Sequence, residues 1–238
     1  MDGAPSFDRR AYSAHVREQA ARVWQSLLVQ EDRSREATER LVVDLERFAA
    51  PRAVVDRARA VASEEARHVA ICEHLVHQLG SQPCRPAIEL AAMPEDDASF
   101  EAAMLDVLVA GFAVAETMSV GGFAATRSRA REPLARWALE EMLRDEVGHG
   151  TFGEEAGQWA MRGFSSSQRR AMWPACVAAM EVLERRTGGP VGPRAEEYVA
   201  PSVEALGAPA SVVVGRGMLR ATERWVLPRL GRMGVLPA

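Results

Sequence analysis

Apolar residues recur every three to four positions through most of this chain, which is the spacing of one face of an α-helix. The alternation typical of half-buried strands does not occur. Proline at positions 51 and 133 suits the first turn of a helix, and glycine at positions 80 and 163 suits a helix end. Helices are therefore predicted at 17–49, 51–80, 97–129 and 133–163, with a short helix left open from Phe7.

These helices form two hairpins. Residues 81–96 connect the hairpins and contain three prolines. Two hairpins joined by one long connection are typical of a four-helix bundle, so the predicted fold is all-α. We assign residues 1–163 to the bundle and residues 164–238 to C-terminal helices packed on it within the same domain. In that extension we expect a helix that Trp173-Pro174 kinks or breaks, a loop over 188–209 and a last helix over 211–233. Its apolar residues are candidates for the wall of a substrate pocket or a dimer interface: Met172, Trp173, Val177, Met180, Trp225 and Leu230.

Charged residues interrupt the apolar faces of these helices. Glu65 and His68, three residues apart, share a face with Ala58, Val69 and Leu75. The pair recurs at Glu146 and His149 in the fourth predicted helix, also on an apolar face. The other two helices each carry one inward glutamate, Glu31 and Glu116. A surface i,i+3 contact is the alternative for each pair, and a slip of register is the alternative for Glu31.

The spacing predicts that these six side chains meet. Glu31 precedes Glu65 by 34 residues, and Glu116 precedes Glu146 by 30, so each hairpin returns its pair to one level. Carboxylates buried without partners cost several kcal/mol each, and no inward arginine is evident for all four. Two divalent cations would balance the four negative charges, and the histidines would add nitrogen ligands.

With these residues the chain resembles the ferritin-like superfamily in its diiron-carboxylate (rubrerythrin- and oxygenase-like) branch, over about residues 20–162. The resemblance implies an up-down-down-up bundle with a long crossover, and a metal site of Glu31, Glu65, His68, Glu116, Glu146 and His149. The stretch EEARH (64–68) is similar to the fingerprint of oxygen-activating members, which implies that Glu64 and Asp145 hold the opposite histidines. The second copy, DEVGH (145–149), departs from the pattern because Gly148 replaces arginine.

The resemblance implies two iron ions, or manganese or a mixed Mn/Fe pair, and an oxidase or oxygenase that uses O₂ on a small organic substrate with an external electron donor. A rubrerythrin-like peroxidase and a non-enzymatic iron-binding or storage protein remain alternatives. Against the peroxidase, the chain has no rubredoxin-type set of cysteines for electron delivery. Against iron storage, a ferritin subunit would not need a tail of about 75 residues.

Small residues near the predicted metals have two interpretations. Gly150 and Gly153 flank His149, and Cys72 follows His68 by one turn. They give either close helix packing and core filling or room for O₂ and substrate beside the metals. We therefore name them as candidate cavity residues.

Net charge and cysteine content limit the possible partners and compartments of the protein. The net charge is −4 and the pI about 5.8, which argues against a nucleic-acid or anionic-membrane partner. Three cysteines without a CxxC pair, and an N-terminus without an apolar signal core, favour the cytoplasm. The apolar stretch 102–115 is too short to span a bilayer and contains Asp106. A homodimer is left open.

Overall fold

The computed structural model describes residues 3–90, 92–187 and 199–237, and this part of the chain is helical and contains no strand. The first half of the fold comprises η1 (Arg9–Ala11), α1 (Ala14–Arg47), α2 (Arg52–Gln78), α3 (Asp97–Asp106), η2 (Val107–Glu116), α4 (Thr117–Arg129) and α5 (Pro133–Ala160). The C-terminal part comprises α6 (Ser166–Arg170), α7 (Trp173–Thr187), α8 (Pro201–Ala205), α9 (Ser211–Ala221), η3 (Thr222–Val226) and α10 (Leu227–Met233).

Side-chain caps determine where the long helices begin. The side chains of Ser13, Asp96 and Glu132 accept hydrogen bonds from the backbone N–H groups of the first turns of α1, α3 and α5. Pro133 follows the last of these caps at the first helical position. Gly80 follows α2 with a φ of 97°, a conformation that favours glycine.

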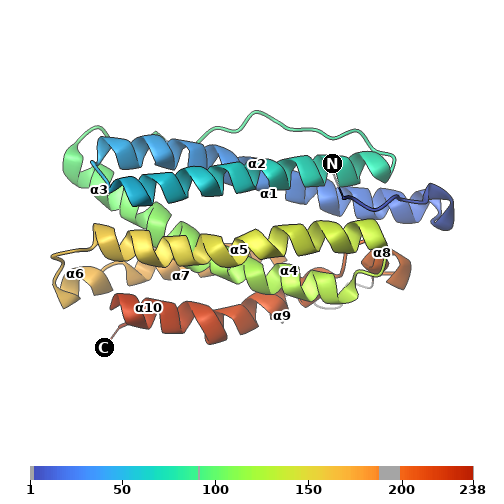
Figure 1. The fold of residues 1–238 in the computed structure, drawn as a ribbon. Coiled ribbons are helices and arrows are strands. Elements are labelled where there is room, and N and C mark those ends of the chain that lie inside the picture. The colour runs from blue at the N-terminus through green and yellow to red at the C-terminus, as the bar shows by residue number, and fades with distance from the viewer. Residues whose placement is uncertain (1–2, 91, 188–198, 238) are drawn as a thin grey trace.

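The long helices form a bundle of two hairpins (Figure 1). α1 packs against α2, α4 against α5, and α2 against α5. The connection after α2 returns along the outside of the bundle, so α2 and the α3–η2–α4 stretch run in the same direction.

Two apolar clusters divide the bundle core. One cluster contains Leu45, Val61 and Phe112, and the other contains Trp24, Leu75 and Leu139. In α1 the residues before position 31 belong to the Trp24 cluster, and those after position 38 belong to the Phe112 cluster. In α2 the order is reversed, with the boundary at residues 65–68. The buried polar residues therefore occupy a layer between two dry regions.

π-helical segments interrupt two helices that the sequence predicts as continuous. η2 replaces the middle of the predicted helix 97–129, and it ends at Glu116. η3 interrupts the predicted last helix. In a π-helix the hydrogen bonds span one residue more than in an α-helix, which changes the residues that face inward. η2 is apolar nearly all round, so its hydrophobic pattern gave no sign of the change in period.

The C-terminal helices pack on the bundle. α7 contacts η2, and α9 contacts α4 so closely that a Cβ atom on Gly121 would overlap the backbone of Gly217. The break predicted at Trp173-Pro174 occurs, because α6 ends at Arg170 and α7 begins at Trp173. The loop predicted over 188–209 contains α8, and its residues 188–198 lie outside the described residues.

None of the six C-terminal apolar residues named as a pocket wall or dimer interface lines the cavity described below, and the dimer interface stays a prediction. Met172, Trp173, Met180 and Leu230 belong to or pack against the apolar cluster around Phe112, and Trp225 is 39% exposed.

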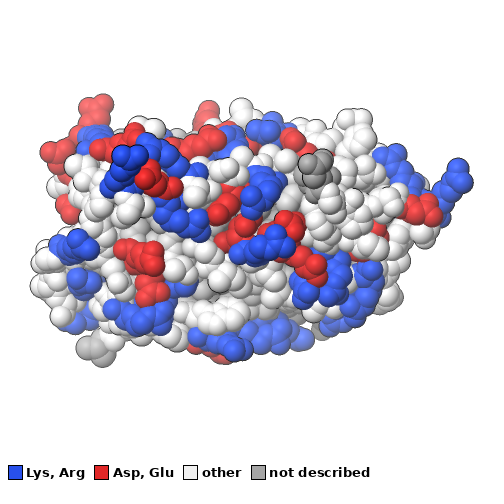
Figure 2. Space-filling view, viewed as in Figure 1, with Lys and Arg blue, Asp and Glu red and all other residues white. Residues whose placement is uncertain are grey.

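Two surface features bear on membranes and charge. The helical stretch Asp97–Arg129 is long and apolar enough to cross a membrane, so the stretch 102–115 understated its length. Half of its apolar 18-residue window is buried inside the protein. Acidic and basic side chains are interspersed on the face shown in Figure 2.

Candidate metal centre

Six acidic and imidazole side chains meet in the polar layer of the bundle. Glu65, His68, Glu146 and His149 are at most 2% exposed, and Glu31 is 7% exposed. Glu116, the last residue of η2, is partly buried. They come from all four long helical stretches: Glu31 from α1, Glu65 and His68 from α2, Glu116 from η2, and Glu146 and His149 from α5.

The two imidazole rings lie on opposite sides of the centre. Their centroids are 5.7 Å apart, and both rings direct Nδ1 towards the carboxylates. Nδ1 of His68 lies 3.2 Å from Oε2 of Glu31, and Nδ1 of His149 lies 3.9 Å from Oε2 of Glu116. Each half of the bundle therefore supplies one histidine and one single glutamate to its own side of the centre.

The glutamates of the two Glu-x-x-His pairs span both sides. In Glu65, Oε1 lies 3.2 Å from Nδ1 of His149, and Oε2 lies 3.7 Å from Nδ1 of His68. In Glu146, Oε1 lies 3.5 Å from Nδ1 of His68, and Oε2 lies 3.7 Å from Nδ1 of His149. Two carboxylates that each reach both histidines are suited to bridge a pair of cations.

The outer nitrogens of the two rings contact the carboxylates that precede the opposite glutamates. Nε2 of His68 lies 3.0 Å from Asp145, and Nε2 of His149 lies 3.1 Å from Glu64. Each contact crosses between α2 and α5. A carboxylate on the outer nitrogen fixes the orientation of the ring and makes the inner nitrogen a better ligand.

An arginine pairs with each of these outer carboxylates, but the two arginines lie at different positions relative to the Glu-x-x-His motifs. Arg67, inside the first motif, donates a hydrogen bond to Asp145. The second motif has glycine at the matching position, and Nη1 of Arg57 donates to Glu64 over 3.1 Å instead. A Cβ atom on Gly148 would lie 2.5 Å from Nη2 of Arg57. The sequence left this side of the network open, and the structure places there a guanidinium from two turns earlier in α2.

A serine that the sequence analysis did not single out also contacts the centre. Oγ of Ser34 donates to Oε1 of Glu65 over 3.0 Å and lies 3.4 Å from Oε1 of Glu116. Its position one turn after Glu31, on the inward face of α1, was the available signal. This hydroxyl joins carboxylates from both hairpins.

The carboxylates at the centre have pKa values shifted in opposite directions. Burial raises the pKa of Glu31 to about 7, although the hydrogen bond from His68 acts against it. Burial and the charges of Glu116 and Glu65 also raise the pKa of Glu146. Burial acts in the same direction on Glu65, but the adjacent imidazoles of His149 and His68 outweigh it and lower its pKa to about 2.

The histidines respond to this concentration of negative charge. Burial alone would lower the pKa of His68, but Asp145, Glu31 and Glu65 raise it to about 11. For His149, burial is likewise outweighed by Glu116 and Glu65, and the pKa rises to about 10. Without metal, the imidazolium groups therefore provide the positive charge that the carboxylates require.

Unsatisfied atoms show that the site is suited to a cation. Oε2 of Glu65, Oε2 of Glu146 and Nδ1 of His149 are buried without a hydrogen-bond partner. Buried polar atoms normally have partners, and each unpaired one is costly. Two groups have ligand atoms within 4.8 Å of one another, Glu65–Glu116–Glu146–His149 and Glu31–Glu65–His68. They share Glu65, so the residues fit two ions that are held close together.

The small residues named as cavity candidates lie at packed positions. A Cβ atom on Gly153 would overlap the backbone of Ala113 in η2, and one on Gly150 would overlap the side chain of Thr117. Cys72 is fully buried in the cluster around Trp24. Close packing thus accounts for all three residues, and none of them lines the cavity that reaches the centre.

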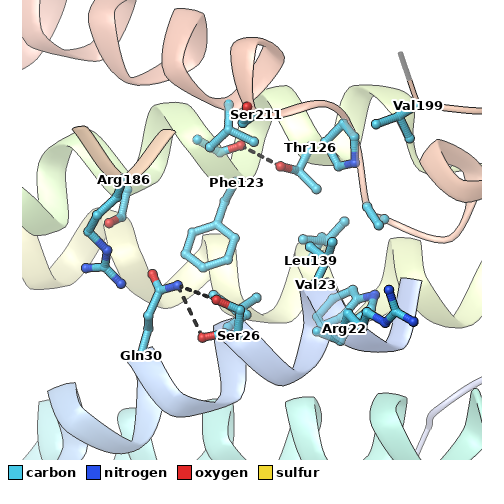
Figure 3. A pocket seen from close by; sticks show the side chains of 18 of the residues that line it. Arg22, Val23, Ser26, Gln30, Phe123, Thr126, Leu139, Arg186, Val199 and Ser211 are labelled. Atoms are coloured by element: carbon cyan, nitrogen blue, oxygen red, sulfur yellow. Dashed lines mark hydrogen bonds between the residues drawn. The ribbon is translucent and has the colours of Figure 1, made fainter. Parts of the chain in front are cut away.

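That cavity lies between α1 and α4 and has a volume of about 770 Å³. It reaches the candidate metal centre at Glu31, which is one of its lining residues. Its other walls come from α5, the end of α7, residues 199–209 and α9 (Figure 3). The sequence gave no signal for it, because its walls come from segments far apart in the chain.

Comparisons with protein-family models, with curated proteins and with solved structures found no match. The functional argument therefore rests on the geometry of this chain.

Proposed function

We propose that the chain is a ferritin-like dimetal-carboxylate protein. The observation that carries the proposal is the position of Glu65 and Glu146, each with one oxygen towards His68 and the other towards His149. Hydrogen bonding within an ordinary buried network would not leave three of these atoms without partners. The long crossover and the direction of the helices support the ferritin-like assignment.

The residues divide into two similar ligand sets. Glu31 and His68 would hold one ion, Glu116 and His149 would hold the other, and Glu65 and Glu146 would bridge them. Four carboxylates then offset the charge of two divalent ions. Iron is the proposed metal, and a ligand set of oxygen atoms with two imidazoles also suits manganese or a mixed pair.

We propose O₂-dependent oxidation of a small organic molecule as the activity. Two ferrous ions would supply the electrons that activate O₂, and an external donor would restore them. The protein's own part is to hold the imidazoles through Asp145 and Glu64 and to exclude water with the two apolar clusters. The cavity at Glu31 favours an organic substrate over the two alternatives, peroxide detoxification and iron storage, because neither needs an organic-sized space.

Anaerobic reconstitution with ferrous iron tests the metal centre. We expect about two iron ions per chain and a Mössbauer spectrum of a coupled pair after exposure to O₂. Glu65→Gln should lose iron, because it removes the bridging carboxylate shared by both ligand sets. Glu73→Gln is the matched control, because Glu73 lies on the same helix and pairs with Arg85 instead.

Two results would contradict the proposal. One is iron content near zero in the unaltered protein, and the other is equal iron content in Glu65→Gln and Glu73→Gln. A very large assembly in gel filtration would instead favour the storage alternative. Rapid turnover of peroxide with a reductant would favour detoxification.

A further inference from the structure

The cavity between α1 and α4 has a roof that the C-terminal segment provides. Nε1 of Trp24 in α1 donates to the carbonyl of Leu206 over 2.8 Å, which holds residues 199–209 against the bundle. On the other side, α9 lies against α4 through Gly121 and Gly217. These contacts give the C-terminal helices a role, because they enclose space beside the metal centre that the first two hairpins leave open.

The lining of the cavity is apolar over most of its surface and cationic near the metal centre. Figure 3 shows Arg186 and Gln30 on one side of Phe123, and Leu139 and Val23 on the other. Gln30 is next to Glu31 in α1, so the side of the cavity with Arg186 is also the side nearest the metals. The opposite side offers the surfaces of Trp24, Leu139 and neighbouring apolar residues.

Arg186 is an exposed residue on the cavity lining. Among the residues that the structure describes, it has no hydrogen bond and no ion pair. The other arginine on the lining, Arg22, is also exposed, but it pairs with Glu18 over 2.6 Å. Burial and the nearby charge of Arg33 lower the pKa of Arg186, while Glu31 acts in the opposite direction. An anion beside Arg186 would therefore relieve two like charges.

Glu31 does not prevent an anion from binding there. It is the only carboxylate on the lining among the described residues, and its Oε2 already contacts Nδ1 of His68 over 3.2 Å. In the proposed metal-loaded protein a cation offsets its charge as well. The positive charge of Arg186 then dominates that side of the cavity.

We propose that this cavity binds an organic acid, with its carboxylate on Arg186 and its apolar body between Trp24 and Phe123. The volume suits a molecule of ten to twenty non-hydrogen atoms, about the size of an aromatic or medium-chain acid. A guanidinium offers paired donors to a carboxylate, and flat aromatic walls suit an apolar body. That this acid is the substrate rests on the proposed oxidase function. Bound in this way, the acid would have the carbons nearest its carboxylate beside the proposed metals.

Ligand binding, measured by calorimetry on the protein as purified with its metal content determined, tests the inference. The probes are 2-naphthoate and octanoate, each compared with its uncharged alcohol, 2-naphthylmethanol and 1-octanol. We expect at least one acid to bind ten-fold or more tightly than its alcohol, because a charge-assisted contact contributes about that much. Arg186→Gln should remove this preference and leave binding of the alcohol unchanged.

Arg185→Gln is the matched control, because Arg185 is the preceding residue of α7 and pairs with Glu181 away from the cavity. It should bind the acid like the unaltered protein. The inference is overturned if neither acid binds, if acid and alcohol bind equally, or if the two arginine variants behave alike. Acid binding by a protein that takes up no iron would reject the proposed oxidase and retain the binding site, whereas two bound irons without acid binding would do the reverse.

Discussion

The guanidinium of Arg57 occupies the space that a side chain at Gly148 would fill. From there it pairs with Glu64, which contacts Nε2 of His149. The equivalent partner on the other side, Arg67, comes from within its own motif and donates to Asp145. The two halves of the centre thus have the same outer charges, supplied from different places in the chain.

The relation between Arg57 and Gly148 predicts a rescue. Arg57→Ala should weaken metal binding about ten-fold, because loss of the group that supports a ligand typically costs 10- to 100-fold. Adding Gly148→Arg to that variant should restore most of the affinity, since the new guanidinium takes the position that Arg67 has in the first motif. Competition with a chelator of known affinity measures the effect.

Gly148→Arg alone should also weaken metal binding, because two guanidinium groups then compete for one space. Arg59→Ala is the control, since Arg59 lies on the same helix and contacts Glu46 and Asp56 at the surface. If the double variant binds metal no better than Arg57→Ala, the two residues are not coupled.

Much of the centre could be predicted because helical spacing fixes it. Two Glu-x-x-His pairs on apolar faces, with one glutamate in each partner helix, are enough to bring six side chains to one level. The helix ends were also predictable, since Pro51, Pro133 and Gly80 punctuate the pattern locally. Whether the six side chains hold iron stays a prediction.

The features that could not be predicted depend on contacts between distant segments. Arg57 lies two turns from Glu64, and only the packing of α2 on α5 brings it beside Gly148. The π-helical turns before Glu116 leave no trace in an all-round apolar sequence. The position of Arg186 on the cavity lining could not be predicted either, because it depends on how α7 packs beside α1 and α4.

The clustered carboxylates predict that metal-free protein is less stable at pH 8 than at pH 5. The pKa of Glu31 is raised to about 7 from 4.5, so its ionisation opposes folding, and stability falls as pH rises from 4.5 through 7. The raised pKa values of His68 and His149 act in the same direction above pH 6.5, because the folded protein retains protons that the unfolded chain releases. Thermal melts of chelator-treated protein across this range measure the effect.

Below pH 4.5 the trend should reverse. The pKa of Glu65 is lowered to about 2, so its contribution to stability is lost as pH falls from 4.5 towards 2. Glu31→Gln should flatten the part of the curve between pH 5 and 7, and Glu73→Gln should leave it unchanged. A metal-free melting temperature that is constant from pH 5 to 8 would contradict a buried carboxylate cluster.

Metal binding should release protons. His68 and His149, with pKa values of about 11 and 10, are protonated at pH 7.5 without metal, and both must lose a proton to become ligands. We therefore expect at least two protons released per chain on loading with Zn²⁺. Calorimetric titrations in two buffers with different ionisation enthalpies count them.

His74→Ala and His77→Ala serve as controls for this titration, because these residues lie on the same helix as His68 and belong to neither ligand group. They should release as many protons as the unaltered protein, and His149→Ala should release fewer. Binding heats that do not depend on the buffer would show that the imidazoles are not ligands.

The contact of Gly153 with η2 predicts a large effect from a single methyl group. In Gly153→Ala the new Cβ overlaps the backbone of Ala113 and Phe112, which cannot rotate away as a side chain can. Forcing an extra methyl into such a contact costs about 1–3 kcal/mol, and here it also pushes η2 away from α5. Chemical denaturation measures the loss, and metal content should fall with it because Glu116 ends η2.

Gly111→Ala separates this packing effect from the intrinsic preference of helices for alanine. A Cβ atom on Gly111 would meet nothing within 4 Å, so this variant should keep or gain stability, by up to about 1 kcal/mol. Both glycines lie in helical segments of the same hairpin, and the two substitutions differ mainly in the space available. If Gly153→Ala is as stable as Gly111→Ala, then α5 and η2 are not in close contact. The other interpretation of Gly153, room for O₂ and substrate beside His149, would then be favoured.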